Sequence, residues 1–249
     1  DETFSNCEQL YYDGYILGVR KLEEDAAPTL GRMLHSYLEV YHNGLRDGKR
    51  AEDAHNDALT EAIVGATKEC YSYGNIHFSF GSEALAREFF GLPDLALRIA
   101  TRYYAFRGQH DAEAYEVLLV EEKIRVEIAP GIHSVGVIDL VTRSREDGRI
   151  AIWEHKSTKT VPEDGVRLRD FQTMLYAEKL RAAFEIDADY IIWNYLRTKE
   201  PAIPEKLQRG GVTRRDNIDT TWEVYAAAVE AEGDDPESPL YDHLRERLT

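Results

Sequence analysis

The sequence predicts an α/β fold with a central mixed β-sheet flanked by helices and a helical N-terminal elaboration. Apolar residues recur at helical spacing in the first third of the chain, and alternating runs rich in Val and Ile follow it. We expect a single domain over residues 1–249, because no low-complexity linker or internal repeat divides the chain. Its predicted parts are a helical region at about 1–110, a sheet core at about 113–196, and C-terminal loop and helices at 197–249.

The N-terminal part contains three predicted helical regions. Pro28 suits the first turn of the first region, and Gly44 suits its C-cap. Pro93 is expected to break the third region, because proline cannot donate the helical hydrogen bond. The predicted helical regions cover residues 28–44, 51–70 and 82–106.

The sheet core contains three predicted strands, then a helix and a fourth strand. The strand runs are bounded by turn residues, as expected for strands that are half buried. Asp147-Gly148 lies between the second and third runs, and this dipeptide is a strong hairpin signal. The predicted strands cover residues 115–129, 133–143, 149–157 and 188–196, the helix covers 167–184, and a closing helix includes 220–232.

The charge distribution limits the classes of partner. A net charge of -16 argues against a generic nucleic-acid binder, because a polyanion is repelled. The segment from Lys156 to Arg215 is locally basic, however, with 12 Lys and Arg against 9 Asp and Glu. We expect a DNA strand to enter a local basic channel, whose predicted cations are Arg167, Arg169, Arg197, Lys199, Arg214 and Arg215.

Cysteine content and apolar runs indicate the compartment. Cys7 and Cys70 are the two cysteines, too few for a disulfide framework and in keeping with a reducing cytosol. No apolar run approaches the ~20 residues that span a bilayer. The opening DETFSNCEQL is acidic and polar, unlike a signal peptide. We therefore expect a cytoplasmic protein without a membrane partner.

Three charged residues lie inside the apolar runs of two predicted strands. Asp139, Glu154 and Lys156 would cost several kcal/mol each if buried without a partner or a metal ion. If Asp147-Gly148 forms a two-residue loop, Asp139 faces Lys156 across the hairpin. A loop longer by two residues puts Asp139 opposite Glu154. In both registers the three side chains project from one face.

This arrangement predicts a metal-dependent hydrolase. Two neighbouring carboxylates repel each other, and a divalent cation such as Mg²⁺ or Mn²⁺ relieves the repulsion. Lys156 beside them can hold a bound water or stabilise negative charge on a phosphate. The alternative is a simple cross-strand ion pair between Asp139 and Lys156.

Four segments in order resemble the PD-(D/E)xK nuclease superfamily, in its RecB-type branch that includes the CRISPR-associated exonucleases. One is similar to the G-x-x-x-H-x-x-L-E helix of that branch, two to its Asp and E-x-K strands, and the last to its Q-x-x-x-Y helix. The matching segments are GRMLHSYLE (31–39), GVIDL (136–140), EHKS (154–157) and QTMLY (172–176). The resemblance implies a restriction-endonuclease-like core.

The resemblance also implies a role for each matching residue. His35, Asp139 and Glu154 would hold the metal, together with the carbonyl group of His155, and Lys156 would be the catalytic lysine. Either Glu121 or Glu122 would play an auxiliary part, and the sequence does not choose between them. The residues that would position the lysine and the nucleic-acid backbone are Gln172 and Tyr176, which share a helix face.

The function implied is a Mg²⁺- or Mn²⁺-dependent DNA exonuclease in phage recombination or DNA processing. Its partners would be DNA ends or single strands, with a homo-oligomer or a recombination protein as a further partner, in the host cytoplasm. Some members of the branch hold an iron–sulfur cluster with one N-terminal and three C-terminal cysteines. Cys7 matches the first position, but no cysteine follows Cys70, so no cluster is expected.

Two other classes of function compete with this interpretation. A non-catalytic DNA-binding or protein-interaction module could retain the nuclease fold, although the intact set of Asp139, Glu154 and Lys156 counts against it. A zinc hydrolase could use His35, Glu39 and His42 of the first helix. Their spacing, however, differs from the H-E-x-x-H pattern of zinc proteases.

Overall fold

A computed structural model describes residues 26–65, 87, 89–162, 171–215 and 217–248, with Gln9, Tyr12 and Leu17 singly. The side chains of residues 128 and 171–174 lie outside this description. The chain divides into two compact units, Asp1–Ser157 with Val161–Leu196, and Thr158–Thr160 with Arg197–Thr249. A single nuclease domain over residues 1–249 stays a prediction.

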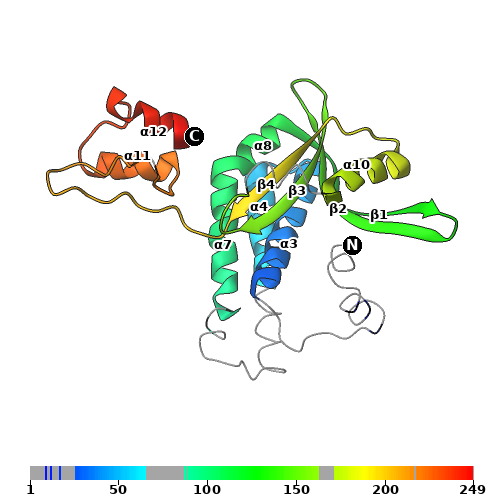
Figure 1. Ribbon diagram of the computed structural model, residues 1–249. Helices are drawn as coiled ribbons and strands as arrows, with labels where there is room; N and C mark the ends of the chain where they lie inside the picture. The colour runs from blue at the N-terminus through cyan, green and yellow to red at the C-terminus, as the bar shows by residue number, and fades with distance from the viewer. Residues whose placement is uncertain are drawn as a thin grey trace. The chain divides into compact units, whose positions relative to one another are not determined.

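Helices on both sides of a sheet form the first unit (Figure 1). The α/β class with a mixed sheet is confirmed, because β1, β2 and β3 pair antiparallel and β4 runs parallel to β3. The helices are α3 (Ala26–Arg46), α4 (Ala51–Ala58), the π-helix η2 (Leu59–Ile63), α7 (Leu92–Tyr103), the π-helix η3 (Tyr104–Gly108), α8 (Gln109–Ala114) and α10 (Phe171–Phe184). The strands are β1 (Tyr115–Ala129), β2 (Ile132–Ser144), β3 (Ile150–Thr158) and β4 (Tyr190–Arg197), in that order across the sheet.

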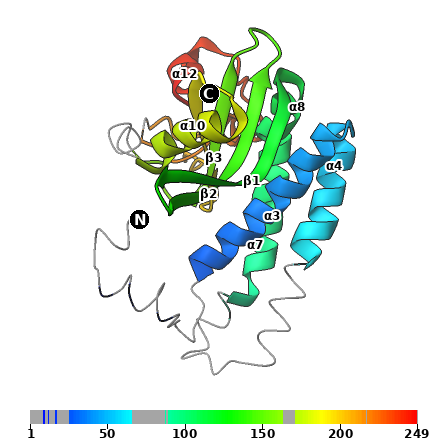
Figure 2. The same ribbon diagram turned by 90° about the vertical axis from the view of Figure 1, so that its right-hand side faces the viewer.

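The helical layer is built around α3, whose apolar stripe is visible in the sequence. Leu34, Tyr37, Leu38 and Tyr41 of this helix are fully buried, and they pack against α4 and α7. The predicted break of the third helical region is confirmed, because α7 begins at Leu92 after a turn at Gly91, with proline in its first turn. Figure 2 shows α3, α4 and α7 on one side of the sheet and α10 on the other.

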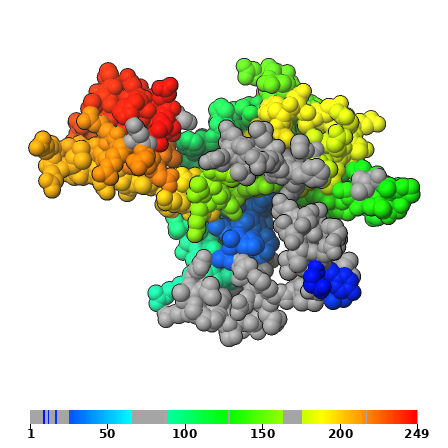
Figure 3. Space-filling model, in the orientation of Figure 1, coloured from blue at the N-terminus to red at the C-terminus, as the bar shows by residue number. Residues whose placement is uncertain are grey.

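The second layer is the packing of α10 on the sheet. Tyr176 and Leu180 of α10 lie in one apolar cluster with Ile124 of β1, Ile138 of β2 and Ile152 of β3. The outer part of the β1–β2 hairpin extends beyond this cluster, and its green tip stands out from the surface in Figure 3. The sheet is therefore held between α3 and α10.

The β2–β3 loop decides how the charged residues face each other. Leu140 pairs with Trp153 and Arg143 with Ile150, so the loop is longer than two residues and the two-residue prediction is wrong. A two-residue turn of the favoured type needs a positive φ at both central positions, and Gly148 has one (75°) whereas Asp147 does not. The longer alternative holds, and this register places Asp139 opposite Glu154.

The second unit has a core of its own. Its helices are α11 (Trp222–Ala231), the 3-10 helix η4 (Pro239–Tyr241) and α12 (Asp242–Leu248). Tyr225, Val229, Tyr241 and Leu244 are buried together, with Trp222 packed against them. The sequence predicted helices in this part of the chain, and the one range it gave, 220–232, contains α11. Within the described part of the chain, no helix is long and apolar enough to cross a bilayer.

Candidate active site

Asp139 is a buried carboxylate at the point where β2 and β3 begin to diverge. Its exposed fraction is 9%, and the backbone N–H of His155 donates to its Oδ2 atom over 2.7 Å. The side chain thus receives a hydrogen bond that a backbone carbonyl would accept in a regular ladder. Asp139 is in this way fixed to β3, at the residue that lies between Glu154 and Lys156.

His35 of α3 meets both strands at this point. Its Nδ1 atom donates to Oε1 of Glu121 over 2.9 Å and lies 3.8 Å from Oδ1 of Asp139. Its Nε2 atom donates to the carbonyl oxygen of His155 over 3.1 Å. The helix predicted to carry a metal ligand therefore brings it to the predicted carboxylate and the predicted carbonyl.

Glu121 is the upstream acid that joins this group. Its neighbours Val120 and Glu122 pair with Leu140 and Ile138, so Glu121 faces Asp139 across the β1–β2 ladder. Its φ of 45° is a left-handed conformation that a glutamate in a strand rarely adopts, at a cost of about 1–3 kcal/mol. The register of β1 on β2 thus selects Glu121 over Glu122, and the sequence alone does not give this register.

Three ligand atoms gather at this site. One atom each from His35, Glu121 and Asp139 lie within 4.8 Å of one another, and no other such group occurs among the described residues. Glu39 and His42 are not members, so the geometry does not support a zinc site on α3. An imidazole nitrogen and two carboxylate oxygens form a donor set that suits Mn²⁺ or Mg²⁺ with retained waters, so the residues present fit the metal that the sequence predicts.

The electrostatics of the group are unbalanced. Burial raises the pKa of Asp139 to about 6, and the charge of Glu121 adds to this, although the His155 N–H, His35 and Lys156 oppose it. The hydrogen bond to Glu121 raises the pKa of His35 to about 9 against the effect of burial, and the charge of Asp139 supports it. A protonated His35 therefore supplies positive charge beside the two carboxylates.

Glu154 and Lys156 lie beside this group. Glu154 has an exposed fraction of 6%, and its Oε1 atom lies 3.5 Å from Nζ of Lys156. The ion pair therefore runs along β3, and among the described residues Lys156 forms none across the strands with Asp139. Lys156 is nevertheless close enough to Asp139 for its charge to lower the pKa of that carboxyl. Glu154, predicted as a metal ligand, lies outside the group of three.

Comparison with known proteins decides the family. The model of the PD-(D/E)XK nuclease superfamily matches residues 2–243. The chain belongs to this superfamily. Over 213 residues it is also 28% identical to a subunit of the ATP-dependent helicase/deoxyribonuclease of Streptococcus mutans serotype c. That match covers 80% of this chain and 18% of the relative, so the chain spans about a fifth of that protein's length.

The helix α10 of this PD-(D/E)XK nuclease carries the two remaining predicted site residues. Tyr176 is buried, and its ring lies against Gly136, where a Cβ atom would come within 2.9 Å of the ring. Only glycine leaves room for this ring three residues before Asp139. Lys179, which the sequence analysis missed, lies over the Tyr176 ring and donates to the carbonyl of Val135. Gln172 lies in the first turn of α10, and its side chain lies outside the described residues.

His155 has a packed side chain as well as the predicted carbonyl. Its ring is stacked on that of His42, with centroids 5.6 Å apart and planes at 5°. Nδ2 of Asn194 on β4 donates to its Nδ1 atom over 3.0 Å. Sequence reasoning missed Asn194, because no local pattern shows which residue of β4 lies beside His155.

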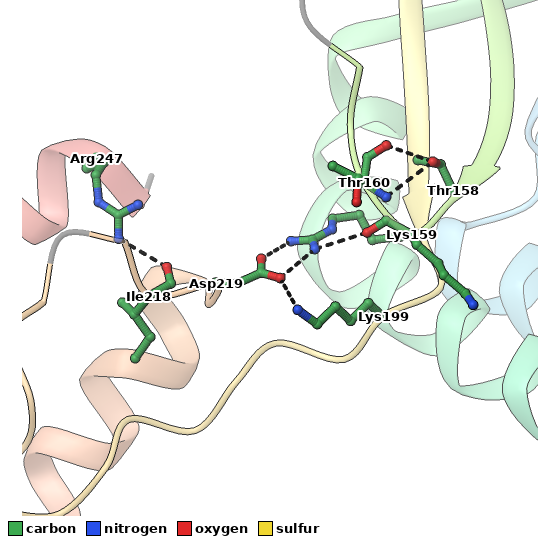
Figure 4. Close-up of polar contacts among 8 residues, drawn as sticks. Thr158, Lys159, Thr160, Lys199, Ile218, Asp219 and Arg247 are labelled. Carbon is green, nitrogen blue, oxygen red and sulfur yellow. Dashed lines mark hydrogen bonds and ion pairs between the residues drawn. The ribbon is translucent and has the colours of Figure 1, made fainter.

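Several predicted channel cations belong to the second unit. Arg197 donates to both carboxylate oxygens of Asp219, and Lys199 donates to one of them over 2.7 Å (Figure 4). Arg214 and Arg215 are exposed. Arg167, Arg169 and both cysteines lie outside the described residues, so the structure does not describe that part of the predicted channel.

Proposed function

We propose that this PD-(D/E)XK nuclease is a divalent-metal-dependent deoxyribonuclease of the RecB-type branch. The observation that carries the proposal is the gathering of His35, Glu121 and Asp139 within 4.8 Å, beside Lys156. Burial and the neighbouring charge of Glu121 raise the pKa of Asp139, so the carboxylate is destabilised in the absence of a cation. A bound divalent cation would remove this destabilisation. The relative that carries deoxyribonuclease in its name supports DNA as the substrate.

Each residue has a distinct chemical task in this proposal. His35, Glu121, Asp139 and the carbonyl of His155 would hold Mg²⁺ or Mn²⁺, with Glu154 at the edge of the site. The bound metal would supply Lewis acidity to the phosphate and lower the pKa of a bound water. The Lys156 ammonium would stabilise the negative charge that grows on the phosphate as its ester bond breaks.

Finer features of the function rest on the sequence resemblance. We infer exonuclease action on DNA ends or single strands, in phage recombination or DNA processing in the host cytoplasm. A homo-oligomer or a recombination partner protein would suit such a task. No iron–sulfur cluster is part of the proposal.

A cleavage assay on end-labelled linear and closed circular DNA tests the proposal. The protein is incubated with Mg²⁺, Mn²⁺ or EDTA, as wild type and as Lys156→Ala. Lys49→Ala is the matched control, because Lys49 forms an exposed ion pair with Asp57 on α4. We expect metal-dependent loss of linear DNA, lowered about a hundredfold or more by Lys156→Ala and unchanged by the control.

Other outcomes have defined meanings. Cleavage of closed circles would replace the exonuclease with an endonuclease and keep the metal site. DNA binding without cleavage under any metal condition would overturn the proposal in favour of the non-catalytic module. Equal cleavage by wild type and Lys156→Ala would remove the lysine from the reaction.

A further inference from the structure

His155 is the residue through which three parts of the site are connected. It lies between Glu154 and Lys156, its N–H donates to Asp139, and its carbonyl accepts from His35. Both main-chain polar groups of one residue are thus committed to predicted metal ligands. A small change in the main-chain conformation at His155 would therefore move Asp139 and His35 relative to each other.

The side chain of His155 is also fixed, by burial, by a ring contact and by a hydrogen bond. Its exposed fraction is 3%, and its ring lies flat against His42 of α3. The Nδ2 amide group of Asn194 can only donate a hydrogen bond, so the Nδ1 atom of the His155 ring accepts it over 3.0 Å. Within the described part of the chain its Nε2 atom has no hydrogen-bond partner, which leaves Asn194 as the partner that sets the ring's rotation.

We propose that Asn194 and His42 are positioning residues of the metal centre. They fix the His155 ring from β4 and from α3, and through it the two main-chain groups that orient Asp139 and His35. The inference rests on the proposed function in one respect, that the group of His35, Glu121 and Asp139 takes a divalent cation. Neither residue is among the proposed ligands of Mg²⁺ or Mn²⁺, and neither is proposed to touch the substrate.

Outer-sphere partners of this kind are known to matter for metal affinity. Hydrogen bonds behind a ligand fix its orientation, and their loss costs about 10–100-fold in affinity or activity. Without Asn194 the buried His155 ring would have no hydrogen-bond partner among the described residues and could turn about its χ angles. His42 contributes a flat surface, so an aromatic ring without nitrogen can take its place.

Mn²⁺ binding to the full-length protein, measured by titration calorimetry, tests the inference. The variants are Asn194→Ala, and Asn194→Leu as a better filled alternative if alanine prevents folding. We expect the Mn²⁺ dissociation constant to rise about tenfold or more in both, with the Mn²⁺ concentration for half-maximal cleavage rising in parallel. His42→Ala should weaken Mn²⁺ binding similarly, and His42→Phe should restore it.

Tyr37→Phe is the matched control for a merely structural role. The Tyr37 hydroxyl donates to Nδ1 of His55 over 2.7 Å, so this variant also removes a buried hydrogen bond to a histidine ring. We expect Tyr37→Phe to lower the melting temperature about as much as the Asn194 variants do, while its Mn²⁺ affinity stays at the wild-type value. Wild-type Mn²⁺ affinity in the Asn194 variants would overturn the inference and leave the proposed function standing. Failure of the wild type to bind Mn²⁺ would overturn both.

Discussion

Asp139 and Asp219 are the same residue type in opposite electrostatic surroundings. Asp139 lies in the first unit with a second carboxylate, Glu121, and burial raises its pKa to about 6. Asp219 lies in the second unit between Arg197 and Lys199, whose hydrogen bonds hold its pKa well below the usual range (Figure 4). The site of Asp139 thus brings carboxylates together, whereas Asp219 is one carboxylate paired with two basic side chains.

The opposite pKa shifts distinguish an aspartate suited to binding a ligand from an aspartate that stabilises the fold. A paired aspartate such as Asp219 favours the folded state by being charged there. For an aspartate whose pKa is raised, the charged form is less stable in the folded protein than in the unfolded chain. Such an aspartate therefore lowers the free energy of unfolding at neutral pH. We expect a bound cation to remove this loss of stability at Asp139, because it would favour the charged carboxylate.

The largest expected effect comes from neutralising each aspartate in turn. Asp139→Asn should abolish Mn²⁺-dependent cleavage, by more than ~100-fold, since loss of outer partners alone costs about 10–100-fold. In EDTA its melting temperature should equal or exceed that of the wild type, because the buried charge is gone. Asp219→Asn should lower the melting temperature and leave Mn²⁺ affinity unchanged. Similar behaviour of the two variants in either assay would break the comparison.

A second, smaller effect distinguishes the two neighbouring glutamates of β1. Glu121→Gln should weaken Mn²⁺ binding about tenfold, because Glu121 is in the group of three and holds His35. Glu122→Gln is the matched control and should bind Mn²⁺ as the wild type does. Calorimetric titration of both variants checks this, and a larger loss in Glu122→Gln would show that Glu122 is the ligand instead.

The smallest expected effect is the pH dependence contributed by Asp219. Its pKa is lowered in the folded state, so its stabilising effect is present above the ordinary aspartate pKa of about 3.9 and is lost as the pH falls below that value. Asp219→Asn should therefore flatten the fall in urea-unfolding free energy between about pH 5 and pH 2. An unchanged slope in Asp219→Asn would contradict the pairing.

The fold and the main site residues could be predicted because their signals are local. Asp139, Glu154 and Lys156 are charges inside apolar runs, so each is visible in a short window. His35 was predicted because its segment resembles a helix of the nuclease superfamily, and amphipathicity alone would not have chosen it. The strand bounds followed from alternation for the same reason. These signals required no knowledge of which segments meet.

The remaining features depend on backbone conformation and long-range pairing. The choice of Glu121 follows from the register of β1 on β2, which includes a shift between Val117 and Leu119. The loop length follows from the conformation of Asp147, and the role of Asn194 from the pairing of β3 with β4. Such features are decided by the assembled sheet, so no local pattern could show them.

The position of Mn²⁺ in a crystal of the protein tests the central claim most directly. Anomalous scattering from crystals grown with Mn²⁺ locates the ion independently of activity. We expect an anomalous peak within coordination distance of His35, Glu121 and Asp139, next to the carbonyl of His155. Mn²⁺ bound elsewhere, with this group still closed by its own hydrogen bonds, would contradict it.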